Sequence, residues 1–266
     1  MKKAVALFLI LLPTLLVGQV TPLYQELIAT SPVKPSIRES EKLNNYIQTL
    51  REREVKSEKK LLQLIFKTTH QNFLKSYSQY ADLGELFVNG QFDCLTATAL
   101  FGIILDELHF DYKIIETNYH IFILVNTEND QVLLETTDRL AGLVDDPAEI
   151  SSRIGSYRQN KIVKSDDNKL YYNYSFDLYH EVSPDQLAGL LYFNQAIKAY
   201  NKHDLLKCSS LLEQSMRIYE SLRVEELAIV LVKSVLESNL SIEIKSRVIL
   251  KYKNFIVSKD SPVASR

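Results

Sequence analysis

The most constraining feature of this chain is a long apolar run followed closely by three short apolar segments. From Asp93 to Leu108 the run has no Pro and is apolar on most sides of a helix, which predicts a buried helix capped by Asp93. Strand patterns follow at residues 112–116, 121–125 and 132–136. The polar stretch 126–131 joins the last two strands into a hairpin. Helices that precede a set of antiparallel strands predict an α+β fold.

Helical periodicity extends on both sides of this unit. Residues 42–80 repeat apolar positions at helical spacing and predict two or three amphipathic helices. Residues 138–161 predict loops or a short helix, and alternating aromatic residues predict another half-buried strand at 169–179. The tyrosines of that strand are expected in the core, and the alternative is a face that binds a sugar or a peptide: Tyr171, Tyr172, Tyr174 and Tyr179. We assign residues 42–182 to this first domain.

The C-terminal part, residues 183–258, is helical in pattern, with Ser183 as N-cap and Pro184 at the first helical position. It contains a helix-turn-helix unit that resembles one tetratricopeptide repeat, carried by Ala196, Asp204, Cys208, Leu212 and Ser215. Fewer than three repeats are visible, so these helical hairpins are expected to pack on the first domain. Cys208 is expected to serve packing.

The N-terminus has the pattern of an export signal. Lys2 and Lys3 precede an apolar run that ends at Gly18, which is shorter than a membrane-spanning helix requires. We expect cleavage of residues 1–18 and a periplasmic or secreted protein with no stable membrane insertion. Prolines in residues 19–41 predict an extended lead-in, and residues 259–266 are expected to form a disordered tail.

Composition excludes some classes of partner. The net charge is -2 and no dense Lys/Arg stripe is present, so nucleic acid is not an expected partner. Only two cysteines are present, and we expect no disulfide between them. No metal or other cofactor is predicted, because the remaining histidines lack ligand spacing: His70, His109, His180 and His203.

Cys94 is the residue best placed for nucleophilic chemistry. It begins the predicted buried helix, where free N–H groups and the helix dipole favour a thiolate. Asp93 opposes this effect by its charge, but its carboxylate can be used to cap the helix. The alternative role of Cys94 is that of a small buried apolar residue.

A thiolate needs an imidazole partner, and His120 opens the strand at 121–125. If Val125 pairs with Val132 beside the hairpin turn, Glu135 lies diagonally across from His120 on the same face of the sheet. A register change of one residue would bring Asp138 to that face, so Asp138 stays as the alternative acid. Without such a centre, His120 is an ordinary histidine at a strand edge.

Three segments together resemble the transglutaminase-like superfamily, a distant relative of the papain-like fold. They are Gly90-Gln-Phe-Asp-Cys94-Leu-Thr-Ala-Thr-Ala-Leu, Tyr119-His120-Ile-Phe-Ile-Leu-Val and Val132-Leu-Leu-Glu135-Thr-Thr. The resemblance covers roughly residues 60–140 and implies a Cys94 nucleophile with His120 as general base and acid. Glu135 stands where the family commonly has Asp before Pro-Thr. Gln91 is the nearest side chain that could help to hold an oxyanion, beside the Cys94 backbone N–H.

These features lead to two functional hypotheses. The first is an exported thiol hydrolase or acyltransferase that acts on an amide or isopeptide bond of a peptide or protein through a Cys94 thioester. The second is a noncatalytic transglutaminase-like scaffold whose C-terminal helices, around residues 192–219, form a groove for a peptide or protein partner.

Overall fold

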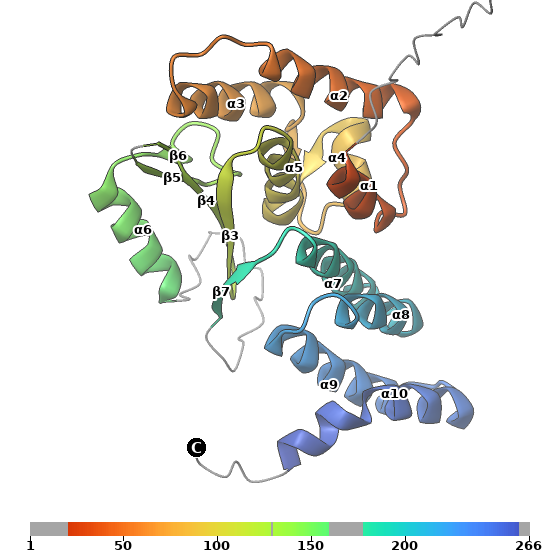
Figure 1. Cartoon of the computed structure of the whole chain (residues 1–266). Coiled ribbons are helices and arrows are strands. Elements are labelled where there is room, and N and C mark those ends of the chain that lie inside the picture. Colours follow the sequence, from red (N-terminus) through yellow and green to blue (C-terminus); the bar gives the residue numbers. More distant parts are fainter. Residues whose placement is uncertain (1–20, 129, 160–177, 261–266) are drawn as a thin grey trace, which may run out of the picture.

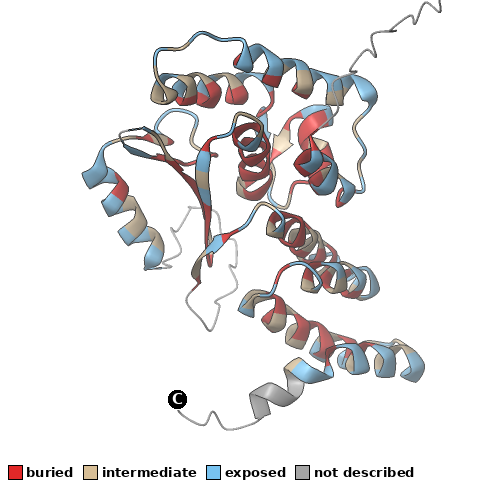
Figure 2. Ribbon diagram, in the orientation of Figure 1, coloured by how far each residue is buried: buried red, intermediate tan, exposed pale blue. Residues whose placement is uncertain are grey.

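The structure is a computed structural model that describes residues 21–128, 130–159 and 178–260 (Figure 1). Its centre is the helix α5 (Cys94–Glu107), which is buried along nearly its whole length (Figure 2). An antiparallel sheet lies on one side of α5, and the first four helices lie on its other side and above it. The predicted α+β class is confirmed. The predicted signal segment, residues 1–18, lies outside the described residues.

The N-terminal helices are α1 (Pro22–Ala29), α2 (Ile37–Arg51), α3 (Glu58–Asn72) and α4 (Leu83–Asn89). The prediction of an extended lead-in was therefore wrong for much of residues 19–41. The hydroxyl of Thr21 caps α1 by accepting a hydrogen bond from the N–H of Tyr24 at 3.0 Å, and Pro22 occupies the first helical position. A proline is favourable at that position, because its missing N–H would have no helical partner.

The main sheet, within the described residues, has the strand order β6-β5-β4-β3-β7. Its strands are β3 (Asp111–Thr117), β4 (Ile121–Asn126), β5 (Gln131–Leu134), β6 (Leu143–Val144) and β7 (Tyr179–Val182). The hairpin of β4 and β5 pairs Val125 with Val132, which is the predicted register. Most of the strand predicted at 169–179 lies outside the described residues, and β7 begins at its last residue. A separate parallel pair, β1 (Ser76–Tyr77) and β2 (Gln91–Phe92), was not predicted.

The two faces of the sheet belong to different hydrophobic clusters. Ile121, Ile123 and Val125 belong to the main core with the apolar residues of α5, whereas Phe122 and Leu124 pack with residues of α6 (Pro147–Arg158). This alternation is the period of two that a strand imposes on its side chains. The helix α6 occupies half of residues 138–161, the segment for which loops or a short helix were predicted.

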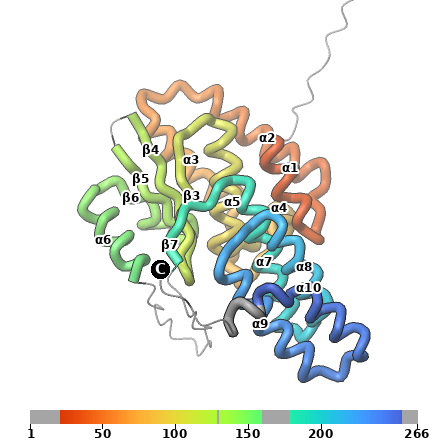
Figure 3. Tube along the Cα trace, turned by 60° about the horizontal axis from the view of Figure 1, so that its bottom comes forward, coloured from red at the N-terminus to blue at the C-terminus, as the bar shows by residue number. Residues whose placement is uncertain are grey.

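The C-terminal helices are α7 (Gln186–Asn201), α8 (Leu205–Met216), α9 (Leu222–Glu237) and α10 (Ile242–Asp260). Figure 3 shows α7 with α8 and α9 with α10 as two neighbouring helical hairpins. The N-cap of α7 is Asp185, so the predicted start at Ser183 and Pro184 was two residues early. The prediction that Cys208 is packed inside is confirmed, because it is fully buried.

These helices pack on the first domain, as predicted, through contacts of α7 with α5, and α7 also contacts α1, which precedes that domain. The helix α10 continues to Asp260, so residues 259 and 260 are helical, while residues 261–266 lie outside the described part. No helix in the described ranges combines the length and apolar character needed to span a membrane.

Candidate active site

Cys94 is the first residue of α5. The Asp93 carboxylate caps this helix: its Oδ1 accepts hydrogen bonds from the N–H of Thr96 at 2.8 Å and from the Thr96 hydroxyl at 2.9 Å. Its Oδ2 accepts a hydrogen bond from Asn194 of α7 at 3.1 Å. Cys94 itself is partly exposed. Cys94 therefore lies at a capped helix N-terminus, as predicted.

The electrostatic surroundings of Cys94 favour the neutral thiol. Burial raises the pKa of the Cys94 thiol most, and the carboxylates of Asp93 and Glu135 raise it further. The backbone N–H of Leu95 and the charge of Arg223 act in the opposite direction, but they do not balance the burial. Burial and the two carboxylates thus act against the thiolate that the helix N-terminus was expected to favour.

His120 and Glu135 form the ionisable pair that the hairpin register predicts. The Nε2 atom of His120 donates a hydrogen bond to the Oε2 atom of Glu135, whose side chain is almost fully buried. The turn before β4 is closed by Thr117, whose Oγ1 accepts a hydrogen bond from the N–H of His120 at 3.1 Å. Asp138 does not take this role, because its Oδ1 accepts two N–H groups of its own turn at 2.9 and 3.0 Å.

Tyr157 of α6 completes the surroundings of this pair, and it was not predicted. Its hydroxyl donates to Oε2 of Glu135 at 3.1 Å, and its ring centroid lies 4.8 Å from that of His120. Thr137 donates to the other oxygen of Glu135 at 3.0 Å. The spacing of Ile150, Ile154 and Tyr157, which is i, i+4 and i+7, is the sequence signal that would have indicated a helix facing the sheet here.

The Cys94 and His120 parts of the site are joined through two consecutive residues. Glu135 contacts His120, and the hydroxyl of the next residue, Thr136, donates a long hydrogen bond of 3.5 Å to the carbonyl of Cys94. Thr136 also lies 3.1 Å from the hydroxyl of Thr98 on α5. Within the described residues no hydrogen bond joins the Cys94 sulfur to a His120 nitrogen. All three predicted residues therefore lie near the same end of the sheet, with the thiol and the imidazole still separate.

His70 of α3 lies beneath this junction and was predicted only as a residue without ligand spacing. Its Nε2 lies 3.1 Å from the carbonyl oxygen of Thr136, and its Nδ1 lies 2.8 Å from that of Phe66. Burial lowers the pKa of His70. The imidazole thus supports the segment that carries Glu135 from the side opposite to Tyr157.

The remaining predictions for the site concern Gln91, metal binding and the tyrosines of residues 169–179. Gln91 lies in β2, and its backbone N–H donates to Asn89 at 3.0 Å, but its side-chain amide makes no hydrogen bond in the described part of the chain. Among the residues that the structure describes, no group of three His, Cys, Asp or Glu side chains could hold a metal ion. Tyr171, Tyr172 and Tyr174 lie outside those residues.

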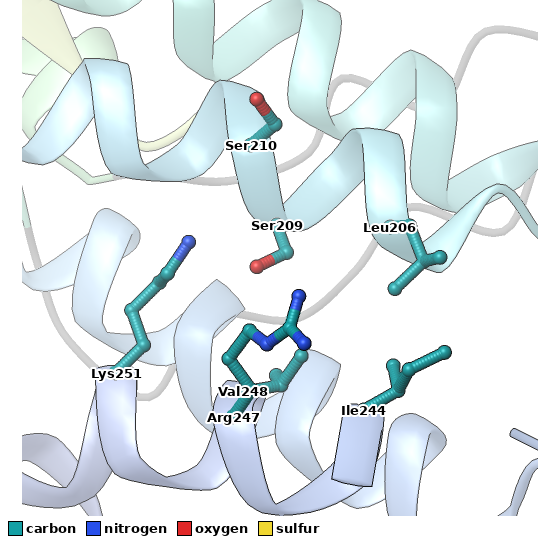
Figure 4. Close-up of a pocket in the computed structure, with 7 residues that line it drawn as sticks. All are labelled: Leu206, Ser209, Ser210, Ile244, Arg247, Val248 and Lys251. Atoms are coloured by element: carbon teal, nitrogen blue, oxygen red, sulfur yellow. The ribbon is translucent and has the colours of Figure 1, made fainter. Parts of the chain in front are cut away.

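A surface pocket of about 190 Å³ lies between α8 and α10 (Figure 4). Leu206, Ile244 and Val248 form its apolar wall, and the charged side chains of Arg247 and Lys251 lie at its polar side. None of the residues that line it belongs to the Cys94 site. This pocket is therefore a feature of the C-terminal helices, separate from the candidate active site.

Comparison of the chain with protein-family models, with curated proteins and with solved structures finds no match in any of the three.

Proposed function

We propose that this chain is an exported cysteine hydrolase or acyltransferase of transglutaminase-like type, acting on amide or isopeptide bonds of a peptide or protein. The observation that carries the proposal is the His120–Glu135 pair at the end of the sheet where Thr136 contacts Cys94. A nucleophile, a base and a residue that orients the base are the three parts of such a centre. The proposed export follows from the N-terminal sequence pattern.

In the proposed reaction Cys94 starts as a thiol, as its raised pKa indicates. His120 takes the thiol proton as the sulfur attacks the substrate carbonyl, and the backbone N–H of Cys94 stabilises the oxyanion that forms. Collapse of the tetrahedral intermediate breaks the C–N bond, and His120 returns the proton to the leaving amine. Water or a second amine then releases the acyl group from the Cys94 thioester, with His120 again as base.

Glu135 orients the imidazole in this scheme. Its bond to Nε2 of His120 leaves Nδ1 as the nitrogen that exchanges the proton with Cys94. Because no hydrogen bond joins Cys94 and His120 in the described residues, the imidazole must approach the sulfur when the substrate binds. Catalytic hydrogen bonds often tighten only in the complex with substrate.

Trapping of the acyl-enzyme tests this proposal. The purified chain is mixed with p-nitrophenyl acetate or a glutamine-containing peptide, and acylation of Cys94 is followed by mass spectrometry. Loss of a general base costs roughly 100-fold in rate or more, and this is the expected effect of His120→Ala. Cys208→Ser is the matched control, because that buried cysteine lies in α8, and it should leave the rate unchanged. Equal acylation rates in wild type and His120→Ala would contradict the proposal.

The scaffold hypothesis remains the second candidate, and two observations favour it. The pKa of Cys94 is raised, and the pocket between α8 and α10 offers an apolar wall beside the cationic side chain of Arg247, suited to an acidic peptide, while Lys251 at the same side pairs with Glu213. A scaffold would show no acylation at any pH and would lose peptide binding on Leu206→Asp. An enzyme would instead show acylation of Cys94, and its peptide binding would not depend on Leu206.

A further inference from the structure

A buried ionic cluster joins α9 to the strand that precedes His120. The guanidinium of Arg223 pairs with Glu116, with 2.9 Å between Nη1 and Oε1, and the hydroxyl of Tyr219 donates to Oε2 of the same carboxylate. Glu116 lies near the end of β3 and is 2% exposed. Charged groups this deeply buried lose their hydration, so contacts with neighbouring side chains must replace it.

The same guanidinium holds the turn between β3 and β4. Its Nη2 donates to the carbonyl oxygens of Thr117 at 2.7 Å and of Asn118 at 3.1 Å. Thr117 is in turn bonded to the backbone of His120 in both directions, with its N–H donating to the carbonyl at 2.8 Å and its Oγ1 accepting the N–H at 3.1 Å. Arg223 thus holds Thr117 and Asn118 in place. The position of these two residues determines where the turn places His120.

The packing of the C-terminal helices keeps this cluster in place. A Cβ atom added at Gly189 of α7 would overlap the Cβ atom of Tyr219, so the helix backbone contacts Tyr219 directly. His180 of β7 also faces the cluster, with Nε2 3.8 Å from Oε2 of Glu116 and its ring stacked on Tyr219. The cluster is therefore enclosed by α7, α9 and β7.

We infer that Arg223 is a positioning residue for His120, so that the C-terminal helices are a structural part of the catalytic centre and any displacement of α9 reduces its activity. This inference deepens the proposed function and rests on it. Stability alone does not account for the cluster, because apolar residues of equal volume are often as stabilising as a buried ion pair. The geometry of the Arg223 guanidinium accounts for it, because its N–H groups can bind two adjacent carbonyl oxygens.

The test compares Arg223→Gln with Arg217→Gln, an exposed arginine at the end of α8 that pairs only with Glu213 among the described residues. Two measurements are made on the full chain: amide hydrogen exchange at residues 117–120, and the NMR signals of the His120 ring. Arg223→Gln is expected to speed exchange in this turn about tenfold or more and to shift the His120 signals, while Arg217→Gln leaves both unchanged. Unchanged exchange and signals in Arg223→Gln would overturn the inference.

A second measurement separates positioning from a direct electrostatic effect on Cys94. Acylation by p-nitrophenyl acetate should fall about 10- to 100-fold in Arg223→Gln, and this loss should vanish when His120 is already Ala. An equal loss in the His120→Ala background would show that Arg223 acts on Cys94 without His120, and would overturn the inference.

The failure of the proposed function is distinguishable from the failure of this inference. If His120→Ala leaves acylation unchanged, the function fails, yet the exchange and NMR measurements still decide whether Arg223 holds the turn. If Arg223→Gln does not fold, Tyr219→Phe removes the hydroxyl that bonds Glu116 and Ser221, keeps the ring, and should increase exchange in the same turn to a smaller extent. Exchange unchanged in Tyr219→Phe would then contradict the role of the cluster.

Discussion

The Asp93 carboxylate caps the helix that begins at Cys94 and, from the adjacent position, raises the pKa of the Cys94 thiol. The two effects arise from the same group but depend on different properties. Capping needs only an acceptor oxygen for the N–H of Thr96, whereas the effect on the thiol needs negative charge. A substitution that removes the charge and keeps the acceptor can therefore separate them.

Asp93→Asn is that substitution. The pKa of Cys94 should fall towards the value of an ordinary thiol, because one of the carboxylates that raise it is gone, and the cap should persist because asparagine is also a favourable N-cap. The measurement is the pH dependence of iodoacetamide alkylation in a Cys208→Ser background. Asp106→Asn, at the exposed far end of α5, is the control and should not move the curve. A curve that stays in place for Asp93→Asn would contradict this account.

Glu135→Gln should have opposite effects on two properties of the site. Loss of the carboxylate lowers the pKa of Cys94, so the alkylation curve moves to lower pH. The same change weakens the bond that orients His120, so acylation should fall by about 100-fold or more. Alkylation and acylation are measured on the same variant to check these two opposite effects. Acylation that remains at the wild-type rate would mean that Glu135 does not orient the base.

Tyr157→Phe should have a modest effect, because it keeps the ring that lies 4.8 Å from His120 and removes only the hydroxyl, which bonds Glu135 and Arg153. A lost hydrogen bond of this kind costs about 1 kcal/mol, or more when it leaves a buried acceptor unpaired. Urea unfolding measures this loss. Tyr192→Phe on α7 is the control, and equal stabilities of the two variants would show that the hydroxyl of Tyr157 contributes nothing.

The local part of this site could be predicted from sequence. Strand alternation and a short hairpin loop fix the diagonal neighbours across β4 and β5, so the approach of Glu135 to His120 followed from the pairing of Val125 with Val132. The cap of Asp93 on α5 followed from residue type and position. The first contact is fixed by the register of one strand pair, and the second joins residues close in sequence.

The contacts made across the fold could not be predicted in this way. Arg223 reaches residues more than 100 positions away, and its role depends on how α9 packs against β3. The direction of the Cys94 pKa shift depends on burial, which the chain acquires only when α5 is surrounded. The prolines of residues 19–41 predict extended structure, but Pro22 begins α1, because proline is also favourable at the first position of a helix.

Gly142→Ala should destabilise the protein through the segment that carries Glu135. The carbonyl of Gly142 accepts a hydrogen bond from the N–H of Glu135 at 2.6 Å, and an added Cβ atom would overlap the carbonyl oxygens of Glu135 and Asp138. Forced backbone shifts of this kind cost about 1–3 kcal/mol. Gly155→Ala is the matched control, because no atom lies within 4 Å of a Cβ atom there. It lies within α6 and should gain roughly 0.5–1 kcal/mol in unfolding free energy.

Chemical unfolding of both glycine variants checks this prediction, and acylation should fall together with stability only in Gly142→Ala. The reason is that displacement of Glu135 also displaces the partner of His120. Destabilisation of similar size in both variants would show that Gly142 has no special role at the site.

His70 should make the stability of the fold depend on pH. Burial lowers its pKa in the folded state by more than the carbonyl oxygens of Phe66 and Thr136 raise it, so the unfolded chain takes up a proton first as the pH falls below about 6.5. Unfolding then becomes easier, and the stability contributed by neutral His70 is lost progressively until the pH passes below its folded pKa. His70→Gln removes this titration, so its unfolding free energy should fall less than that of wild type over the same range. Urea unfolding between about pH 5 and 8 measures the difference, with the exposed His203→Asn as control. Parallel curves for wild type and His70→Gln would show that His70 is not held neutral.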